Sequence, residues 1–307
     1  MKIAIVGIGG VGGYYGGKLA LKYAPSDDHQ TFFIARGEHL NKIRKNGLKL
    51  ITTEGDFTAT PSLATDNPKE LGPLDLIFLC VKGYGLENAA QMIADNLHGD
   101  TVTIPLLNGV DNVERLNSIL HGGTILNGCV YISTHFVRPG VIQQTGGSCK
   151  LLFGPESGSV EPYRKIETLL KDADIEADLS EKITVDAWSK YLFVGPLAGV
   201  TSMLEKPFGA IMEKAGYRRM LERMMKEVKS VADAKGIPLP ENIIEQSLEL
   251  TSSFPYETKS SMQLDFEKGK ETEIETFTGY IIKSGKESGI ETPLHDKVYF
   301  ELTNRKG

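Results

Sequence analysis

The sequence has little cysteine, and its placement suits neither disulfides nor metal ions. Cys80, Cys129 and Cys149 are the three cysteines among 307 residues, and no C-x-x-C pair occurs. The six histidines are scattered, without an H-E-x-x-H motif or a neighbouring cysteine. We therefore expect reduced thiols in a reducing cytoplasm and no metal site.

Excess basic charge and long apolar runs are also missing. The formal net charge is −6, which disfavours nucleic acid and anionic membrane as partners because both attract basic surfaces. No apolar stretch is long enough to span a bilayer, and the N-terminal run is too short for a signal peptide. The sequence predicts a cytoplasmic protein with a small-molecule partner, and it leaves monomer and homodimer open.

The first part of the chain alternates short apolar runs with helical patterns. This alternation predicts βαβ units and a mostly parallel sheet covered on both faces. The expected strands and helices are Lys2–Val6, Gly12–Lys22, Thr31–Ala35, Leu74–Val81, Leu86–Leu97, Thr101–Leu107 and Thr124–Tyr131. The Thr-rich segment Lys49–Ser62 predicts a small hairpin or an edge strand. Arg138–Gly140 predicts a turn between two further apolar segments.

From Ser180 onward the pattern is helical. Gly195-Pro196, Gly236-Ile237-Pro238 and Gly289 are suitable helix stops. The expected helices are Lys182–Val194, Phe208–Lys235, Glu241–Leu250 and Glu275–Ser288. With 307 residues the chain is long enough for two domains, which we place at residues 1–180 (α/β) and 181–307 (all-α).

The most informative motif is the glycine loop Gly7–Gly12, which fits G-x-G-x-x-G between an expected strand and an expected helix. In such a loop the first glycine permits a tight turn, the second lets the backbone approach a pyrophosphate, and the third lets the helix pack closely. The candidate cofactor-binding residues here are Gly7, Ile8, Gly9, Gly10, Val11 and Gly12. The alternative is a glycine-rich turn that binds nothing. The context favours a dinucleotide-binding Rossmann domain, and Gly13, Gly16 and Gly17 suggest close packing of the helix.

The end of the second expected strand indicates the type of cofactor. NAD sites usually carry an Asp or Glu there to hold the ribose 2′-hydroxyl group. Here the strand runs into Arg36, whose guanidinium can clamp a 2′-phosphate. The sequence therefore predicts NADP(H). The alternative is that Arg36 is a solvated loop charge and that Glu38 holds the ribose.

Several polar residues are candidates for substrate chemistry. Lys82 and Asn108 follow expected strands, where open α/β sheets place their ligands, and Lys190, Ser261 and Glu273 lie in the helical half. Each also has a structural interpretation when taken alone. Lys190 fits a surface lysine, Ser261 a helix N-cap, Glu273 a solvated charged face, Lys82 an ordinary strand end, and Asn108 a turn.

Together, in this order, these motifs resemble the ketopantoate reductases (2-dehydropantoate 2-reductases) over nearly the whole chain. The two most specific matches are Ser261–Asp265 and Gly269–Glu275. The others are the glycine loop, Val81–Gly83, Leu107–Gly109 and Trp188–Lys190. The resemblance implies NADPH-dependent reduction of ketopantoate to pantoate, a step of pantothenate biosynthesis.

The resemblance also implies roles for individual residues. Lys190 would be the general acid, and Glu273 would help to position substrate and cofactor. Ser261 would bind the substrate carboxylate, while Asn108 and Lys82 would line the site near nicotinamide and substrate. A lysine suits this chemistry because hydride attack on a ketone builds negative charge on its oxygen, which a cation stabilises and protonates.

The sequence departs from the family at two positions on one helix face. The family usually has Asn four and eight residues after its lysine, where this chain has Val194 and Ala198. Either Thr201, Ser202 or Tyr191 substitutes for these amides, or the substrate is another 2-oxo acid. Gly195-Pro196 is expected to break the helix and to move later residues off that face.

Two other functions compete with this one. A β-hydroxyacid or polyol-phosphate dehydrogenase of similar build is the first. A phosphate-bearing substrate would need a basic cluster in the helical half, but Arg218, Arg219 and Arg223 lie among glutamates and are typical of a salt-bridged helix surface. The second is a non-catalytic NADP(H)-sensing protein, which would keep the glycine loop and Arg36 without needing Lys190.

Overall fold

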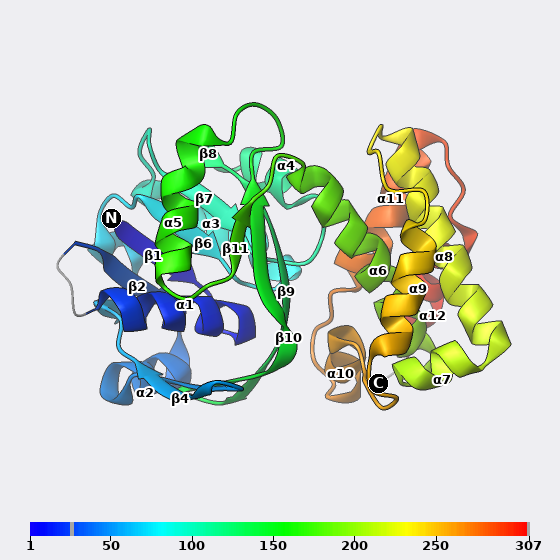
Figure 1. Ribbon diagram of the computed structural model, residues 1–307, viewed down its shortest axis with the longest axis horizontal. Coiled ribbons are helices and arrows are strands. Elements are labelled where there is room, and N and C mark those ends of the chain that lie inside the picture. Colours follow the sequence, from blue (N-terminus) through cyan, green and yellow to red (C-terminus); the bar gives the residue numbers. More distant parts are fainter. Residues whose placement is uncertain (25–27, 306–307) are drawn as a thin grey trace. The chain divides into compact units, whose positions relative to one another are not determined.

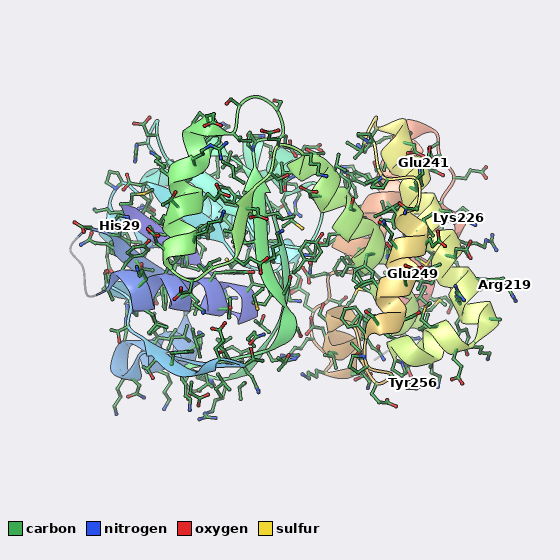
Figure 2. All side chains as sticks on the ribbon, in the orientation of Figure 1. His29, Arg219, Lys226, Glu241, Glu249 and Tyr256 are labelled. Carbon is green, nitrogen blue, oxygen red and sulfur yellow. The ribbon has the colours of Figure 1, made fainter. Side chains whose placement is uncertain are left out.

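The computed structural model describes residues 1–24 and 28–305; Figure 1 shows the chain trace and Figure 2 its side chains. The chain divides into two compact units. Unit 1 comprises Met1–Leu107 and Asp111–Ile183, and unit 2 comprises Asn108–Val110 and the chain from Thr184 onward. Within the described residues, no helix combines the length and the apolar character needed to cross a membrane.

Unit 1 is built on a six-stranded sheet in which every pair of neighbouring strands is parallel, as predicted. The strand order is β5-β2-β1-β6-β7-β8. The strands are β1 (Lys2–Val6), β2 (Gln30–Ile34), β5 (Leu63–Thr65), β6 (Leu76–Leu79), β7 (Val102–Pro105) and β8 (Thr124–Ile125). Its helices are α1 (Gly10–Tyr23), α2 (Gly37–Asn46), α3 (Leu86–Ile93), α4 (Asn112–Asn117) and α5 (Arg164–Asp172).

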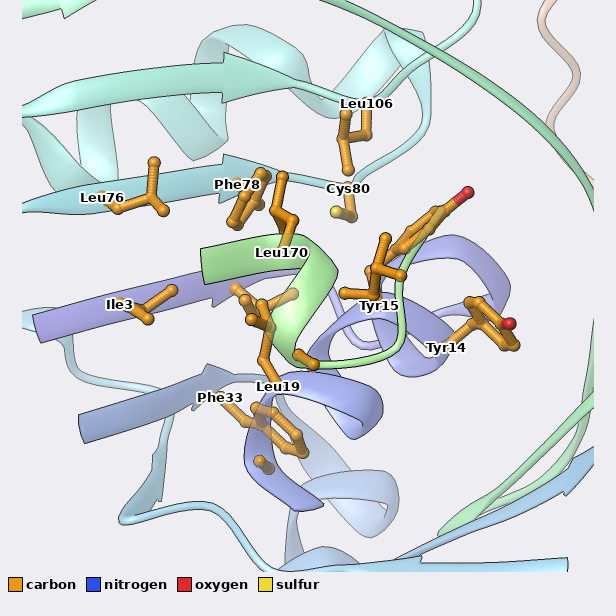
Figure 3. Close-up of a cluster of buried hydrophobic side chains, with 14 of the residues drawn as sticks. Ile3, Tyr14, Tyr15, Leu19, Phe33, Leu76, Phe78, Cys80, Leu106 and Leu170 are labelled. Atoms are coloured by element: carbon orange, nitrogen blue, oxygen red, sulfur yellow. The ribbon is translucent and has the colours of Figure 1, made fainter. Parts of the chain in front are cut away.

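Successive side chains of β1 enter two different cores. Ile3 and Ile5 belong to a cluster with residues of α1 and α5, part of which Figure 3 shows in close-up. Ala4 and Val6 face the opposite way and pack with residues of α3 and α4. Because both faces are covered, the strand is apolar from Ile3 to Val6 instead of alternating.

A second sheet completes unit 1. It follows the path β11-β10-β3-β4, and β9 pairs antiparallel with β10. Its strands are β3 (Leu48–Thr52), β4 (Gly55–Ala59), β9 (Asn127–Arg138), β10 (Val141–Gly154) and β11 (Ala177–Leu179). The hairpin β3–β4 and the turn at Arg138–Gly140 confirm two predictions.

The glycines of α1 let this helix pack closely against both sheets. A Cβ on Gly16 would lie 2.9 Å from the Ile5 side chain of the parallel sheet. A Cβ on Gly13 would lie 2.6 Å from Ile142 in β10, and one on Gly17 would collide with a leucine of β3. The close packing predicted from these glycines is therefore confirmed, on two faces of one helix.

We expect Gly13→Ala to destabilise unit 1 by about 1–2 kcal/mol, because Ile142 must shift to admit the methyl group. Thermal unfolding should show a midpoint lowered by roughly 2–8 °C. Gly216→Ala is the matched control, since a Cβ on this helical glycine would have no atom within 4 Å, and it should be neutral or stabilising. A Gly13→Ala midpoint at or above that of wild type would contradict the packing argument.

Unit 2 is helical, as predicted, around a single apolar core. Its helices are α6 (Ile183–Leu204), α7 (Phe208–Glu213), α8 (Ala215–Ala234), α9 (Ile243–Ser253), α10 (Ser261–Glu267), α11 (Tyr280–Ser288) and α12 (Pro293–Thr303). A π-helical turn, Glu275–Gly279, leads directly into α11. Residues 195–202 of α6 are all buried, so this helix lies at the centre of the unit.

Two predicted boundaries in unit 2 are wrong. Helix α6 does not stop at Gly195-Pro196 but continues to Leu204. Proline removes one backbone hydrogen bond there, but the buried apolar residues around it hold the helix together. The predicted helix Phe208–Lys235 is two helices, because Lys214 is extended and α7 instead docks on the segment around Tyr256.

Candidate active site

The glycine loop combines a tight turn with an open space before helix α1. Gly7 has φ +90°, and a Cβ there would lie 2.9 Å from the Val81 side chain. Gly9 differs, because no atom lies within 4 Å of the position of its Cβ. Helix α1 begins at Gly10 without a side-chain cap, so its first N–H groups remain available for an anion. The loop therefore fits a dinucleotide pyrophosphate.

Arg36 lies at the start of α2, directly after strand β2. Its backbone is extended, its side chain is exposed, and Gly37 follows with φ +62°. Among the described residues, no carboxylate lies within ion-pair distance of the guanidinium. Glu38, in the first turn of α2, is exposed as well. The structure thus places both candidates for the ribose subsite at the same helix start.

Lys82 follows strand β6 in unit 1, next to a residue that contacts the glycine loop. It is half-buried and precedes the short 3-10 turn Gly83–Gly85. Its neighbour Val81 supplies the side chain that packs against Gly7. The glycine loop and Lys82 are therefore positioned by adjoining strand ends of the same sheet.

Lys190 and Asn108 form a hydrogen-bonded pair in unit 2. The Lys190 Nζ donates to Asn108 Oδ1 at 3.1 Å, and both side chains are half-buried. Asn108 belongs to the short segment Asn108–Val110 of this unit, and Val110 packs on its apolar core. This hydrogen bond holds the lysine head group in place. A freely solvated surface lysine would lack such a contact.

Glu273 is buried, although it lies in a highly charged stretch. Its exposed fraction is 3%, whereas Lys270 and Glu271 are exposed. The solvated-face interpretation of Glu273 is therefore wrong. The segment that follows is tied to α6, because the Tyr191 hydroxyl lies 2.8 Å from the carbonyl oxygen of Thr276 and 3.0 Å from that of Phe277.

The residue beside Ser261 provides the cap of α10. Ser260 Oγ accepts a hydrogen bond from the Gln263 N–H at 3.2 Å, so the N-cap interpretation of Ser261 is wrong by one residue. Ser260 Oγ also lies 2.8 Å from Thr201 Oγ1 of α6. Ser261 is exposed at the first position of the helix, and its hydroxyl is not needed as the cap.

Helix α6 therefore organises the residues of unit 2. Lys190 lies on it, Tyr191 holds the turn after Glu273, and Thr201 holds the serine next to Ser261. The anchoring roles of Tyr191 and Ser260 had not been predicted. Helical periodicity marks Tyr191 only as a core residue, and neighbouring serines give no signal as to which one caps a helix.

The basic side chains of α8 form a solvated helix surface. Figure 2 labels Arg219 and Lys226 on this helix. Glu222 accepts from Lys226 at 2.6 Å, and Lys226 together with Arg218 lowers the pKa of that carboxyl group. Glu227 instead caps α12, accepting from the N–H of Leu294 at 2.9 Å. Arg218, Arg219 and Arg223 are exposed, as predicted for a helix surface, but the described residues show no ion pair between them and Glu222 or Glu227. The salt bridges of this helix are made by lysines instead.

Comparison with known proteins gives matches over both units. Residues 3–158 match the family model described as ketopantoate reductase PanE/ApbA, and residues 182–305 match the model of its C-terminal part. The uncharacterized oxidoreductase YkpB of Bacillus subtilis is 30% identical over 98% of both chains.

Two solved structures extend this likeness. One is a 2-dehydropantoate 2-reductase from Porphyromonas gingivalis, which is 32% identical with a TM-score of 0.84 and 99% of both chains covered. The other is a D-mandelate dehydrogenase bound to NADH and anilino(oxo)acetate. It is 23% identical, with a TM-score of 0.87 and 99% of this chain and 97% of that chain covered, and it shares the fold.

Proposed function

The chain belongs to the ketopantoate reductase family of oxidoreductases, and from this premise we propose that it reduces the keto group of a 2-oxo acid with NADPH. The observation that supports this most directly is the pair Lys190–Asn108. It presents an ammonium group on the central helix of unit 2, at the position that the family resemblance assigns to the general acid.

The chemistry requires one hydride and one proton. NADPH, when bound, supplies the hydride to the keto carbon. Lys190 stabilises the negative charge that develops on the keto oxygen and donates the proton, which yields a 2-hydroxy acid. Asn108 orients the lysine, and solvent restores its proton. Ser261 binds the substrate carboxylate, and Glu273 and Lys82 position substrate and cofactor.

The cofactor assignment rests on three features of unit 1. The space at Gly9 and the uncapped start of α1 suit a pyrophosphate. The exposed guanidinium of Arg36, with no carboxylate at the end of β2, suits a ribose 2′-phosphate. These features favour NADPH over NADH.

Ketopantoate is the first candidate substrate, because the Porphyromonas gingivalis relative is a 2-dehydropantoate 2-reductase. A second candidate is a 2-oxo acid with an apolar side chain. It is favoured by Val194 and Ala198, which follow Lys190 at helical spacing on α6. Two of the proposed polar substitutes are already engaged, since Tyr191 bonds backbone carbonyls and Thr201 bonds Leu197 and Ser260.

A matched pair of substrates tests the proposal and separates the candidates. Trimethylpyruvate is ketopantoate without its hydroxyl group, so the ratio of the two kcat/KM values measures recognition of that group. A site that hydrogen-bonds the hydroxyl group should prefer ketopantoate by about 10⁴-fold. An apolar site should accept trimethylpyruvate at least as well. NADPH binding without oxidation by any 2-oxo acid would contradict the proposed reduction.

A further inference from the structure

His39 lies in the first turn of α2 and contacts the glycine loop. Its Nε2 lies 2.7 Å from the backbone oxygen of Ile8, and its Nδ1 accepts a hydrogen bond from the Gly140 N–H at 2.9 Å. Because an N–H can only donate, Nδ1 has no proton, and Nε2 must carry the proton that is donated to Ile8. The two contacts therefore define one neutral tautomer.

Burial lowers the pKa of His39, although its bond to Ile8 acts in the opposite direction. The neutral imidazole that the two contacts require is thus favoured. Its ring also meets Phe136 edge-on, with ring centroids 5.0 Å apart. The side chain is therefore contacted by two separate parts of unit 1, the glycine loop and the β9–β10 hairpin.

The bond to Ile8 restrains the part of the glycine loop that a pyrophosphate would approach. Ile8 lies between Gly7, which has φ +90°, and Gly9, which has open space at its Cβ position. On the other side, the Gly7 N–H donates to Ile34 at the end of β2, at 3.0 Å. The Gly7–Ile8 peptide is therefore flanked by two anchors, and His39 holds the next peptide, whose N–H belongs to Gly9.

The second contact of His39 connects the loop to the second sheet. Gly140 forms the turn between β9 and β10, with φ +78°, and its carbonyl oxygen accepts from the Lys49 N–H at 2.9 Å. Because this hydrogen bond holds the turn against β3, the Gly140 N–H keeps a fixed position next to the imidazole. His39 also lies three residues after Arg36, so one short segment carries both side chains.

We propose that His39 is a positioning residue of the cofactor site, which holds the Ile8 carbonyl so that the loop backbone meets the pyrophosphate. The inference rests on the proposed function, since it requires the loop to bind a nicotinamide dinucleotide. His39 acts on cofactor affinity and takes no part in the reduction itself.

Three substitutions separate the two hydrogen bonds. The amide nitrogen of Gln reaches about as far as Nε2, so His39→Gln retains a donor to Ile8. The shorter Asn places its oxygen near Nδ1, so His39→Asn retains only the acceptor for Gly140. His39→Ala removes both. His121→Gln is the control, because that histidine is exposed on the surface of the same unit.

We expect His39→Ala and His39→Asn to weaken NADPH binding about 5- to 10-fold, the usual effect of losing one hydrogen bond. His39→Gln and His121→Gln should stay within about twofold of wild type. The kcat at saturating NADPH should change less than twofold in all four variants. Direct titration gives the Kd, and steady-state kinetics give kcat and KM separately.

Two results would overturn the inference while leaving the proposed function intact. One is a folded His39→Ala protein with wild-type NADPH affinity. The other is equal weakening in His39→Gln and His39→Asn, which would make the residue merely structural; this comparison holds even if His39→Ala does not fold. Failure of the wild-type protein to bind any nicotinamide dinucleotide would contradict the proposed function itself, and this inference with it.

Discussion

Replacing Lys190 by alanine should lower kcat/KM for the 2-oxo acid by about 10³-fold. Removing a positioned proton donor typically costs 10²- to 10⁴-fold, and here the same group also stabilises the charge on the keto oxygen. A factor of 10³ corresponds to about 4 kcal/mol of transition-state stabilisation. The measurement is the initial rate of NADPH oxidation over a range of substrate concentrations.

The reason to expect an effect of this size is that the Lys190 head group is already oriented. Its Nζ is hydrogen-bonded to Asn108 at 3.1 Å, on a helix buried along most of its length. The loss should therefore appear in kcat, while the Kd for NADPH stays within about twofold of wild type. Lys286→Ala, on an exposed face of α11, is the matched control and should keep full activity.

Chemical rescue separates proton donation from a structural role. Added methylammonium can enter the space left by the shortened side chain and should restore part of the lost rate in Lys190→Ala. Full turnover in this variant, or a loss matched by Lys286→Ala, would contradict the proposed mechanism. A loss of rate without rescue by any small amine would assign Lys190 a positioning role instead.

The first strand and the first helix of unit 1 could be predicted closely because their signals are local, whereas α2 and β5 were not predicted. Strand β1 has the predicted bounds, Lys2–Val6, since charge precedes the apolar run and glycine follows it. The glycines of α1 predicted close packing because glycine destabilises a helix interior unless a neighbour needs the space of the missing side chain. Local signals predicted two pieces of the second sheet but not how they join, since β10 pairs with β3 from far earlier in the chain.

Unit 2 shows how packing overrides local rules. Pro196 predicted the end of a helix, but surrounding core residues keep α6 continuous through it. Glu273 belongs to a stretch whose composition predicts a solvated face, yet it alone among the charged residues from Glu267 to Glu275 is buried. Composition gives the average polarity of a segment, but it does not tell which single residue the backbone directs into the core.

The residues of the candidate site also differ in how well the sequence predicts them. The glycine loop could be proposed from its motif, and Lys190 from the resemblance of its surroundings to a known family. Residues that act through backbone contacts could not. His39 contacts the Ile8 carbonyl and the Gly140 N–H, and neither contact leaves a trace in side-chain patterns.

The second large effect expected is on cofactor preference, and it depends on Arg36. Arg36→Ala should reduce the ratio of NADPH affinity to NADH affinity by about 100-fold. A guanidinium on a phosphate forms charge-assisted hydrogen bonds, and 100-fold corresponds to about 2.7 kcal/mol, or roughly the strength of one or two of them. Nearly all of the change should fall on NADPH, since NADH has no 2′-phosphate to lose.

Glu38 provides the decisive comparison, because it lies on the same helix start and is also exposed. If Arg36 holds a 2′-phosphate, Glu38→Gln leaves NADPH affinity unchanged or slightly improved, since it removes a like charge near the phosphate. If Glu38 instead holds the ribose hydroxyl groups, Glu38→Gln weakens NADH binding and Arg36→Ala has no effect. That second pattern would reverse the proposed preference, while the glycine loop would still bind the pyrophosphate common to both cofactors.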